Sequence, residues 1–468
     1  MKRRQFIRTS VLGLGSLSLG LSCKESGRRA EKPNIILVVT DDQRWDTLGC
    51  AGNPIIQTPN MDWLARNGVR FENAFVTTPI CAASRASIFT GTYERTHTYT
   101  FTKPPLSRTF MDISYPFLLR KAGYRTGFIG KFGIEVEKGV TDEMFDVKKW
   151  TSLPHFQIIN GRQRHMTEVE GEYALDFLRS NPKGHPFCLS VSFWAPHADD
   201  DNPQQYFWPP ACDGLYENSH FQVPEPSEPS FFEALPEFLK KSMNRTRWNW
   251  RFDTPEKYQT MLKGYYRMIS GVDLVIGRII QELNRLGMNK NTIIILISDN
   301  GYFLGERGFA DKWLMYDPSV RVPLIICDLR ASEKTCGIVR QEMVLNVDLA
   351  PTILELAGIR VPRMIEGQSL VPLLKGKKAD WRTEIFCEHL WDNPEIPQSE
   401  CIRTDRWKYI RYPQHPEFEE LYDLLNDPHE KYNLAYSPNN RSELLELRKH
   451  CDQKIKSLLN AQEKLATS

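Results

Sequence analysis

A cysteine and an arginine stand four residues apart, as Cys81 and Arg85, within residues 79–91. This segment is typical of the start of a helix, where unpaired backbone N–H groups and the helix dipole favour negatively charged atoms. A cysteine in that place is a candidate precursor of a nucleophile for anionic chemistry. The alternative is a structural cysteine, because free cysteine is among the residue types most often buried in protein cores.

Four hard oxygen donors follow two apolar runs of the chain, residues 34–40 and 292–297, which have the composition of buried strands. These donors are Asp41, Asp42, Asp299 and Asn300. Adjacent carboxylates at the end of a buried strand repel one another unless a positive charge neutralises them. Taken alone, the Asp-Asp pair would also fit a helix cap or a turn. The second pair favours a metal site, and oxygen ligands of this kind suit Ca²⁺.

The residues around Cys81 form the pattern P-x-C-x-A-S-R-x-S-x-x-T-G, which resembles the activation signature of type I, formylglycine-dependent sulfatases of the alkaline-phosphatase-like superfamily. The match continues in residues 33–42, 58–65, 71–74, 298–301 and 312–323. The resemblance implies that a formylglycine-generating or radical sulfatase-maturing enzyme oxidises Cys81 after translation. The hydrated aldehyde of the resulting formylglycine would then attack the sulfur atom of a sulfate ester.

The same resemblance assigns roles to the charged residues. It implies that the four oxygen donors and the modified Cys81 hold Ca²⁺, and that Arg85 hydrogen-bonds the hydrated aldehyde. It also implies three catalytic cations around the sulfate, Lys131, His197 and Lys312, with His197 able to protonate the leaving oxygen. Each of the three has an ordinary alternative, as a solvated lysine or a loop histidine. Together they would supply fixed positive charge where the transition state needs it.

Two positions depart from the family pattern. Gly133 stands where many sulfatases have a histidine that assists the second step, and that step needs a base. The candidates to replace the histidine are His155, His165 and His185, which their local sequence does not distinguish. Arg307 also replaces a common histidine. Arginine is no acid at neutral pH, but it binds carboxylate or sulfate through two parallel hydrogen bonds. We therefore expect Arg307 to bind substrate together with Trp313, with a surface salt bridge as the alternative role for Arg307.

Strand-like and helix-like runs alternate over most of the chain. Strands are expected at residues 34–40, 125–129, 187–193 and 292–297, and helices at residues 61–67, 115–122, 167–180 and 258–286. This order predicts an α/β fold with a large mixed, mainly parallel sheet flanked by helices, as in alkaline-phosphatase-like enzymes. Ligands of such sheets bind beyond the carboxyl ends of the strands, where the motifs described above lie.

The predicted catalytic domain covers residues 33–375, with one interruption at residues 199–250 that is rich in Pro, Trp, Phe and Asn. Its aromatic content argues against disorder, which leaves a substrate-facing insertion or a packed surface excursion. Residues 376–468 resemble the sulfatase C-terminal subdomain, a small antiparallel sheet followed by a helix. The strands are expected at residues 384–389, 400–403, 407–411 and 420–422, and the helix at residues 441–459.

Residues 1–23 resemble a twin-arginine export signal, and residues 24–32 a linker. Arg3 and Arg4 precede an apolar run that is too short to span a bilayer. The residues before Cys23 resemble an imperfect lipobox, so Cys23 would carry a lipid anchor after cleavage. We therefore expect an exported bacterial protein, periplasmic or anchored to a membrane by lipid, that uses the twin-arginine machinery and has no transmembrane helix.

Charge and cysteine content exclude several other classes of protein. The 468 residues carry a formal net charge of +2, but the first 22 contribute four basic residues and no acidic one, which leaves −2 for the remainder. A chain this close to neutral has no basic excess for binding nucleic acid. Of the 10 cysteines, those other than Cys23 and Cys81 match no zinc-binding spacing.

The leading hypothesis is a sulfatase that hydrolyses sulfate esters. The aromatic segment at residues 199–250 and Arg307 favour a sulfated carbohydrate as its substrate. One alternative is a phosphonate or phosphate ester hydrolase of the same superfamily, because relatives with this nucleophile have such activities. Another is a protein that binds sulfated glycans without catalysis, which the glycine at position 133 motivates.

Overall fold

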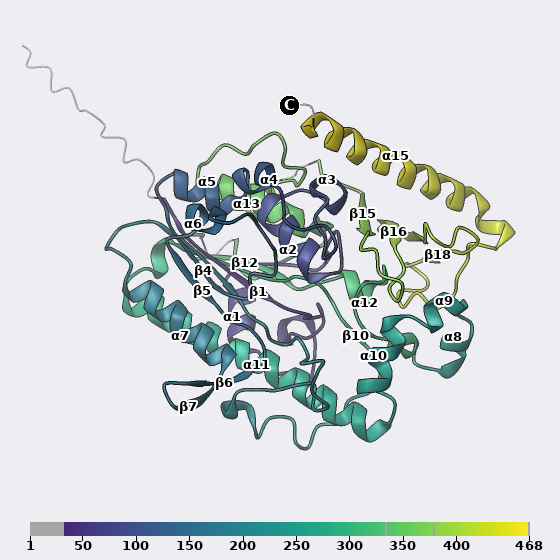
Figure 1. Cartoon of the computed structure of the whole chain (residues 1–468), viewed down its shortest axis with the longest axis horizontal. Helices are drawn as coiled ribbons and strands as arrows, with labels where there is room; N and C mark the ends of the chain where they lie inside the picture. Colours follow the sequence, from purple (N-terminus) through teal and green to yellow (C-terminus); the bar gives the residue numbers. More distant parts are fainter. Residues whose placement is uncertain (1–31, 333–334, 378–379, 467–468) are drawn as a thin grey trace, which may run out of the picture. The chain divides into compact units, whose positions relative to one another are not determined.

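An eight-stranded sheet forms the centre of the computed structural model (Figure 1). Its strands run in the order β13 (Ile338–Arg340), β2 (Val69–Phe71), β12 (Leu324–Asp328), β9 (Thr292–Ser298), β1 (Asn34–Thr40), β8 (Phe187–Ser192), β4 (Arg125–Gly130) and β5 (Val147–Trp150). The structure describes residues 32–332, 335–377 and 380–466, so the predicted export signal, Cys23 and the linker up to residue 31 lie outside the described residues.

Four neighbouring strands, β9, β1, β8 and β4, are parallel, and their registers align their carboxyl ends. Thr40 lies opposite Ser298, and Val39 and Gly130 both lie opposite Ser192. The residues that follow these strands therefore reach the same edge of the sheet. Strand β12 runs antiparallel to both β9 and β2, which makes the sheet mixed, as predicted.

Helices cover both faces of the sheet because alternate residues of a central strand point to opposite sides. Ile36 and Val38 of β1 belong to one hydrophobic core, and Ile35 and Leu37 belong to the other. The first core is closed by α1 (Pro59–Arg66), α7 (Met166–Arg179) and α11 (Pro255–Arg285), and the second by α2 (Cys81–Thr90), α4 (Arg108–Asp112), α5 (Tyr115–Lys121) and α13 (Leu349–Leu356). In Figure 1, α7 and α11 lie below the sheet, and α2, α5 and α13 lie above it.

A four-stranded antiparallel sheet and a long helix follow, as the sequence predicts. These elements are β15 (Glu384–His389), β16 (Ser399–Thr404), β17 (Trp407–Arg411), β18 (Glu419–Asp423) and α15 (Arg441–Ala466). Their core residues Phe386, Ile402 and Leu447 share one hydrophobic cluster with Phe75 and Tyr316 of the larger part. Residues from Lys32 onward accordingly form one compact unit, and the predicted boundary at residue 375 stays a prediction.

Residues 199–250 fold into short helices that pack on the main core. They include η2 (Pro210–Cys212), α8 (Pro229–Glu233), α9 (Glu237–Lys240) and most of α10 (Met243–Arg251). Trp208 and Trp248 pack against the same core as α7 and α11. Arg251 is fully buried, and its guanidinium donates hydrogen bonds to Gln205 and to Asp311. The segment is therefore joined to the main core by apolar contacts and, through ion pairs of Arg251 with Asp200 and Asp311, to the residue just before Lys312.

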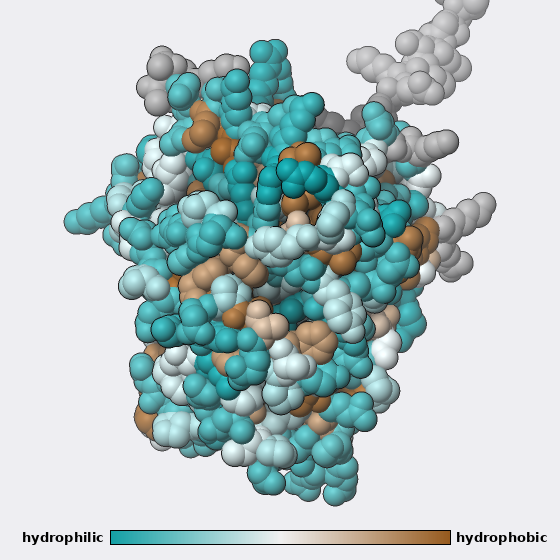
Figure 2. Space-filling model, turned by 90° about the vertical axis from the view of Figure 1, so that its right-hand side faces the viewer, coloured by the Kyte–Doolittle hydropathy of each residue, from teal (hydrophilic) through white to brown (hydrophobic). Residues whose placement is uncertain are grey.

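Short elements connect these layers. They are β3 (Ala74–Phe75), β6 (Phe156–Ile159), β7 (Arg162–His165), β10 (Phe303–Leu304), β11 (Ala310–Asp311), β14 (Val344–Leu345), α3 (Glu94–His97), α6 (Val140–Met144), α12 (Asp317–Val320), α14 (Val371–Leu374), η1 (Gly49–Ala51), η3 (Asn289–Asn291), η4 (Glu306–Gly308), η6 (Asn346–Asp348) and η7 (Pro438–Asn440). Among the described residues, no helix is both long and apolar enough to cross a membrane. Figure 2 shows a mostly hydrophilic face on which hydrophobic residues form small, separate patches.

Candidate active site

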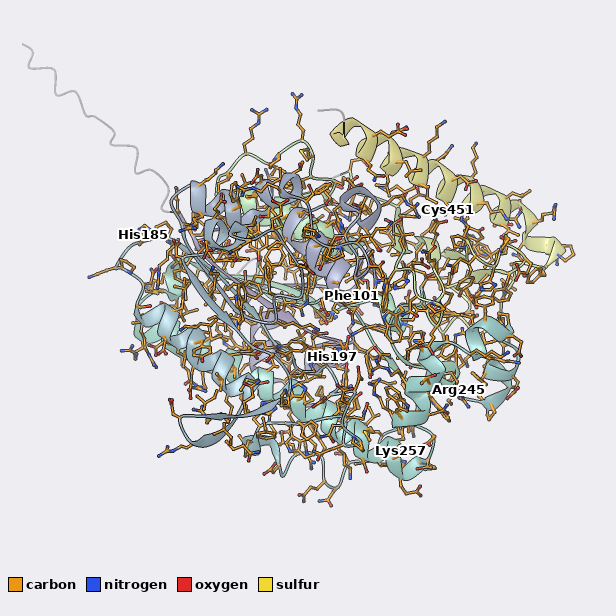
Figure 3. The ribbon with its side chains drawn as sticks, viewed as in Figure 1. Phe101, His185, His197, Arg245, Lys257 and Cys451 are labelled. Atoms are coloured by element: carbon orange, nitrogen blue, oxygen red, sulfur yellow. The ribbon has the colours of Figure 1, made fainter. Side chains whose placement is uncertain are left out.

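The structure brings the predicted catalytic and metal-binding residues to one edge of the central sheet. Asp41 follows β1, Asp299 follows β9 and Lys131 follows β4, while His197 lies in the loop after β8. Cys81 is the first residue of α2. In Figure 3, His197 lies near the centre of the view and His185 at its periphery.

Cys81 sits at a helix start whose capping residue, Ile80, is extended and offers no side-chain hydrogen bond. All ten residues of α2 are buried, and the Cys81 side chain is only 8% exposed. Burial raises the pKa of the Cys81 thiol, and the nearby charges of Lys131 and Lys312 offset this only in part. The unmodified thiol is therefore not a thiolate at neutral pH and is a poor nucleophile.

Arg85 lies one turn further along α2 and binds residues at four strand ends. Its Nε atom donates to Asp299 Oδ2 over 2.8 Å, and Nη2 donates to Asp41 Oδ2 over 3.1 Å. Its Nη1 atom donates to the Lys131 carbonyl oxygen over 2.6 Å and to Ser192 Oγ. One guanidinium thus fixes the start of α2 against β1, β9, β4 and β8, which positions Cys81 relative to the sheet.

Three carboxylates converge within this buried cluster. Burial and the charge of Asp41 raise the pKa of Asp42 and of Asp299 to about 6, against the opposing charges of Lys312 and Arg85. Burial also disfavours ionised Asp41, but Lys131 and His197 outweigh it and hold the pKa of Asp41 below its usual range. Each carboxylate has a cation beside it, yet burial still disfavours the ionised forms of Asp42 and Asp299, which a bound metal cation would favour.

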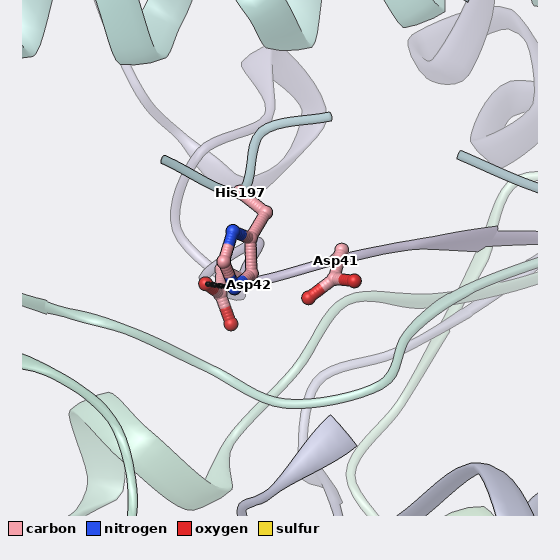
Figure 4. Close-up of side chains that lie close together, drawn as sticks. All are labelled: Asp41, Asp42 and His197. Carbon is pink, nitrogen blue, oxygen red and sulfur yellow. Dashed lines mark ion pairs between the residues drawn. The ribbon is translucent and has the colours of Figure 1, made fainter. Parts of the chain in front are cut away.

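The oxygen atoms of the cluster fit a divalent cation. Asp41 Oδ1 and Asn300 Oδ1 are buried and have no hydrogen-bond partner among the described residues, although an unsatisfied buried polar group costs about 1–3 kcal/mol. Asp41, Asp42 and His197 can each place a ligand atom within 4.8 Å of the others (Figure 4). Oxygen ligands suit Ca²⁺ better than imidazole does, which is consistent with the predicted ligands Asp41, Asp42, Asp299 and Asn300 together with modified Cys81.

Two buried lysines face these carboxylates. Lys131 Nζ pairs with Asp41 and lies 4.4 Å from the centre of the Trp194 ring. Lys312 Nζ pairs with Asp42 and lies 3.9 Å from Asp41 Oδ1. Both side chains are nearly inaccessible to solvent, so the ordinary alternative of solvated lysines is wrong for them.

His197 follows the cis peptide between Ala195 and Pro196. Burial and the nearby charges of Lys312 and Lys131 lower the pKa of His197 to about 4, so the imidazole is neutral at pH 7. Its Nδ1 atom lies 2.5 Å from the Ala198 carbonyl oxygen, which leaves Nε2 directed toward Asp42 Oδ2 at 3.8 Å. The imidazole is thus fixed in orientation at the edge of the carboxylate cluster.

The backbone and the surroundings of Gly133 leave no room for the histidine that many sulfatases have at this position. Its φ of +72° is a left-handed conformation that glycine adopts without strain. A Cβ atom here would lie 2.5 Å from Cδ of Arg85. Because the Arg85 side chain is held by its hydrogen bonds, it has no room to move away.

We expect Gly133→His to destabilise the protein by more than the about 1–2 kcal/mol of a left-handed backbone alone, since its Cβ also displaces Arg85. Thermal unfolding measures the loss. Gly139→His is a matched control, because Gly139 also has positive φ but open space where its Cβ would lie. Equal losses in the two variants would contradict a specific contact with Arg85.

None of the three histidines proposed as replacements has a described hydrogen bond or ion pair with Cys81. His155 Nε2 lies 2.9 Å from the His197 carbonyl oxygen, and its ring stacks on that of His165. His165 accepts a hydrogen bond from the backbone N–H of Thr167 and so caps α7. His185 is exposed. His155 therefore contacts the backbone of the loop that carries His197.

The segment at residues 199–250 supports Lys312, which the sequence does not reveal. Asn244 Nδ2 donates to the Lys312 carbonyl oxygen over 2.7 Å. Asp311 pairs with Arg251 over 2.9 Å and with Arg247 over 3.4 Å. In the sequence, only its Pro- and Trp-rich composition distinguished this segment. Its contacts with Lys312 and Asp311 could not be predicted, because ion pairs between distant elements leave no local sequence pattern.

Aromatic side chains border the start of α2. Trp313 packs with Ile80, and its backbone N–H donates to the Pro79 carbonyl oxygen. Trp391 packs against the same small cluster and contacts the ring of Phe101, with 5.2 Å between ring centres. Phe101 is 47% exposed. The predicted substrate residue Trp313 is thus next to Cys81, whereas Phe101 and Trp391 were not recognised in the sequence.

Arg307 is not brought to this cluster. It lines a different cavity, and its guanidinium lies over the ring of Tyr316 at 4.4 Å. Its side chain is buried and forms no ion pair within the described ranges, so the alternative of a surface salt bridge does not apply. The position of Arg307 could not be predicted from the sequence, because the turn at residues 305–308 directs its side chain away from Lys312.

Two family models and several curated proteins match this chain. The model described as Sulfatase matches residues 33–359, and the one described as N-sulphoglucosamine sulphohydrolase, C-terminal, matches residues 305–458. An N-acetylglucosamine-6-O-sulfatase of Bacteroides thetaiotaomicron is 29% identical over 96% of this chain and 91% of the relative. An arylsulfatase of Clostridium perfringens is 30% identical over 89% of this chain and 93% of the relative.

Solved structures share the fold. A protein in complex with its substrate D-glucosamine-2-N,6-O-disulfate superposes with a TM-score of 0.77 at 27% identity, covering 92% of this chain and 98% of that one. A phosphonate monoester hydrolase of Agrobacterium radiobacter superposes with a TM-score of 0.70 at 22% identity, covering 92% and 96%. The second match reports on the fold alone.

Proposed function

The chain belongs to the sulfatase family and is a sulfuric ester hydrolase, and from this we propose that it removes sulfate from a sulfated glucosamine-type sugar. The observation that carries the proposal is the buried cluster at the strand ends, where Lys131, Lys312 and His197 surround the start of α2. The similarity to an N-acetylglucosamine-6-O-sulfatase and to a structure bound to a disulfated glucosamine supports this class of substrate.

We further propose that Cys81 is converted to formylglycine and that the neighbouring oxygen donors hold Ca²⁺. The hydrated formylglycine would supply the hydroxyl group that attacks sulfur, and the cation would offset charge on the sulfate oxygens. Arg85 orients the Cys81 position, while Lys131 and Lys312 hold the sulfate by fixed charge. His197 directs Nε2 toward the same place. Because Nδ1 faces the Ala198 carbonyl oxygen, the neutral ring carries its proton there, so His197 would have to be protonated at Nε2 to donate to the leaving oxygen.

Phe101 and Trp391 provide an apolar surface for the sugar beside this charge cluster. Their rings are in contact, and Trp391 packs with Trp313, which is bonded to the backbone just before Cys81. Trp391 Nε1 is buried without a hydrogen-bond partner in the described part of the chain, so the ring is offered to a sugar through its apolar face. An aromatic face of this kind suits a sugar ring.

Sulfate release from a panel of glycans tests the proposed function. Protein from its native host, or expressed with a maturing enzyme, should release sulfate from glucosamine 6-sulfate faster than from 4-nitrophenyl sulfate. The Cys81 peptide should show formylglycine by mass spectrometry. A faster rate on an aryl phosphonate would favour the phosphonate hydrolase alternative, and unmodified Cys81 without sulfate release would favour a binding protein.

Removal of the cation should destabilise the protein, because it leaves Asp41, Asp42 and Asp299 buried close together. At a free Ca²⁺ concentration a hundredfold above the dissociation constant, binding stabilises the native state by about 2.7 kcal/mol. We expect EDTA to lower the Tm and to abolish activity, and added Ca²⁺ to restore both. A Tm that does not respond to Ca²⁺ after EDTA treatment would contradict a calcium site.

We also propose that the protein is exported by the twin-arginine machinery and anchored by lipid at Cys23. Arg3 and Arg4 before an apolar run, followed by a lipobox-like segment, support this. Replacing both arginines by lysine should retain the protein in the cytoplasm, and Cys23→Ala should release it from the membrane fraction. If the arginine variant were still exported, the twin-arginine signal would be contradicted. If Cys23→Ala stayed in the membrane fraction, the lipid anchor would be contradicted.

A further inference from the structure

We propose that the cavity beside Arg307 is a second anion-binding site, which takes a small oxyanion, either free sulfate or the anionic group of a sugar. The cavity has a volume of about 320 Å³ and lies between Trp45, residues 224–226, α12 and His429. That volume is in the range of pockets for small ligands. No residue assigned above to the Cys81 site lines it, so the proposal goes beyond the proposed hydrolysis.

Arg307 supplies N–H donors, most of which have no partner among the described residues. Its side chain is 96% buried by the residues around it, being only 4% exposed. Among the described residues, the guanidinium has one long hydrogen bond, from Nη2 to the His429 carbonyl oxygen at 3.5 Å. An arginine side chain has five N–H donors and stays protonated, and burying such a group unpaired is costly. An anion in the cavity would satisfy these donors.

Each carboxylate that lines the cavity forms an ion pair with another cation, and two of these cations each serve two carboxylates. The pairs are Asp46 and Glu306 with Arg44, Glu225 with Lys431, and Asp317 and Glu430 with Lys408. Beneath the Arg307 guanidinium, Glu420 accepts hydrogen bonds from Tyr316, Tyr412 and Tyr422. The charges of Glu420 and Glu430 favour the charged form of Arg307. Within the described chain, however, neither carboxylate accepts a hydrogen bond from its guanidinium, so most of its N–H groups are open to a ligand.

A second arginine of the cavity, Arg321, also favours an anionic ligand. Arg321 lines the cavity with its guanidinium 4.8 Å from the centre of the Trp45 ring and hydrogen-bonded to Glu72. Arg307 is held flat against Tyr316, so its planar fork is fixed before a ligand arrives. A fixed guanidinium binds sulfate or carboxylate through two parallel hydrogen bonds, which lysine cannot reproduce.

Selenate, a sulfate analogue whose selenium scatters anomalously, locates the site directly. Crystals of the full chain with Ca²⁺, soaked in sodium selenate, should show an anomalous peak beside Arg307 as well as one beside Lys312. In Arg307→Gln the first peak should vanish and the second remain. A peak beside Lys312 with none beside Arg307 in the wild type overturns the second site and leaves the proposed function intact.

Calorimetric titration separates free sulfate from a sugar-borne group. The Lys312→Met variant is used because it weakens sulfate binding beside Cys81. Its affinities for sodium sulfate and for glucosamine 6-sulfate are compared, and glucosamine, which lacks the sulfate group, is the control. Adding Arg307→Gln should weaken binding at least tenfold, and Arg307→Lys should also weaken it. Arg245→Gln should not, since the Arg245 guanidinium is stacked 4.0 Å from Phe232 and lines a neighbouring cavity. Equal binding by Arg307→Gln and its parent, with unchanged Tm, overturns the proposal.

Discussion

Protein in which Cys81 is replaced by alanine will keep its fold and lose hydrolysis of sulfate esters by about 10⁴-fold or more in kcat/KM. The loss is that large because, in the proposed mechanism, the modified Cys81 supplies the attacking group. The fold survives because alanine fits the start of α2 and leaves the hydrogen bonds of Arg85 unchanged. Steady-state kinetics and the Tm measure the two effects.

Cys212→Ala is the matched control, since Cys212 is a buried cysteine that lies in η2, outside the cluster. It should lower the Tm slightly and leave kcat/KM unchanged. If Cys81→Ala retained more than a hundredth of the wild-type rate, a different nucleophile would have to be sought. If both variants lost activity together, the loss would reflect packing rather than chemistry.

Replacing Lys312 by methionine is expected to lower kcat by about 10²–10³-fold, the size measured when one preorganised charge-stabilising donor is removed. Methionine keeps most of the volume of the side chain but removes the ammonium group that pairs with Asp42. Fixed positive charge acts on the charge that develops during sulfuryl transfer, so kcat should fall more than KM rises. Kinetics in the presence of Ca²⁺ separate the two parameters.

Lys408→Met controls for the loss of a buried lysine. Lys408, in β17 of the C-terminal sheet, is fully buried and pairs with Asp317 of α12 and with Glu430. Breaking such a pair costs about 3–5 kcal/mol of stability. This variant should therefore unfold at a lower temperature yet keep its kcat per folded molecule. Comparable losses of kcat in both variants would contradict a chemical role for Lys312.

The parts of the fold with strong local patterns were predictable from the sequence. The apolar run of β1 and the helical periodicity of α7 and α11 marked the large sheet and its covering helices, with boundaries shifted by only a few residues. Because parallel strands align their carboxyl ends, residues that follow different strands meet without any pattern linking them. Asp41, Asp299 and Lys131 meet in this way, as the resemblance to sulfatases predicted.

Contacts that depend on packing between distant elements could not be predicted. Nothing near Asn244 in the sequence indicates that it holds the backbone of Lys312, and nothing near Phe101 indicates Trp391. Arg307 was expected at the substrate because of its chemistry, but the turn that carries it leads to another cavity. The reason for Gly133 was equally hidden, since it lies in a contact with Arg85 on α2.

The complete burial of α2 sets an order of events during biosynthesis. Cys81 sits beneath the strand ends, held there through Arg85 by residues whose positions span Asp41 to Asp299. A second enzyme cannot reach that side chain once β1, β8 and β9 have assembled. The oxidation of Cys81 proposed above would therefore compete with folding, and a chain that closes its sheet first would become a stable protein without formylglycine. Slower folding of this region would then raise the yield of active protein.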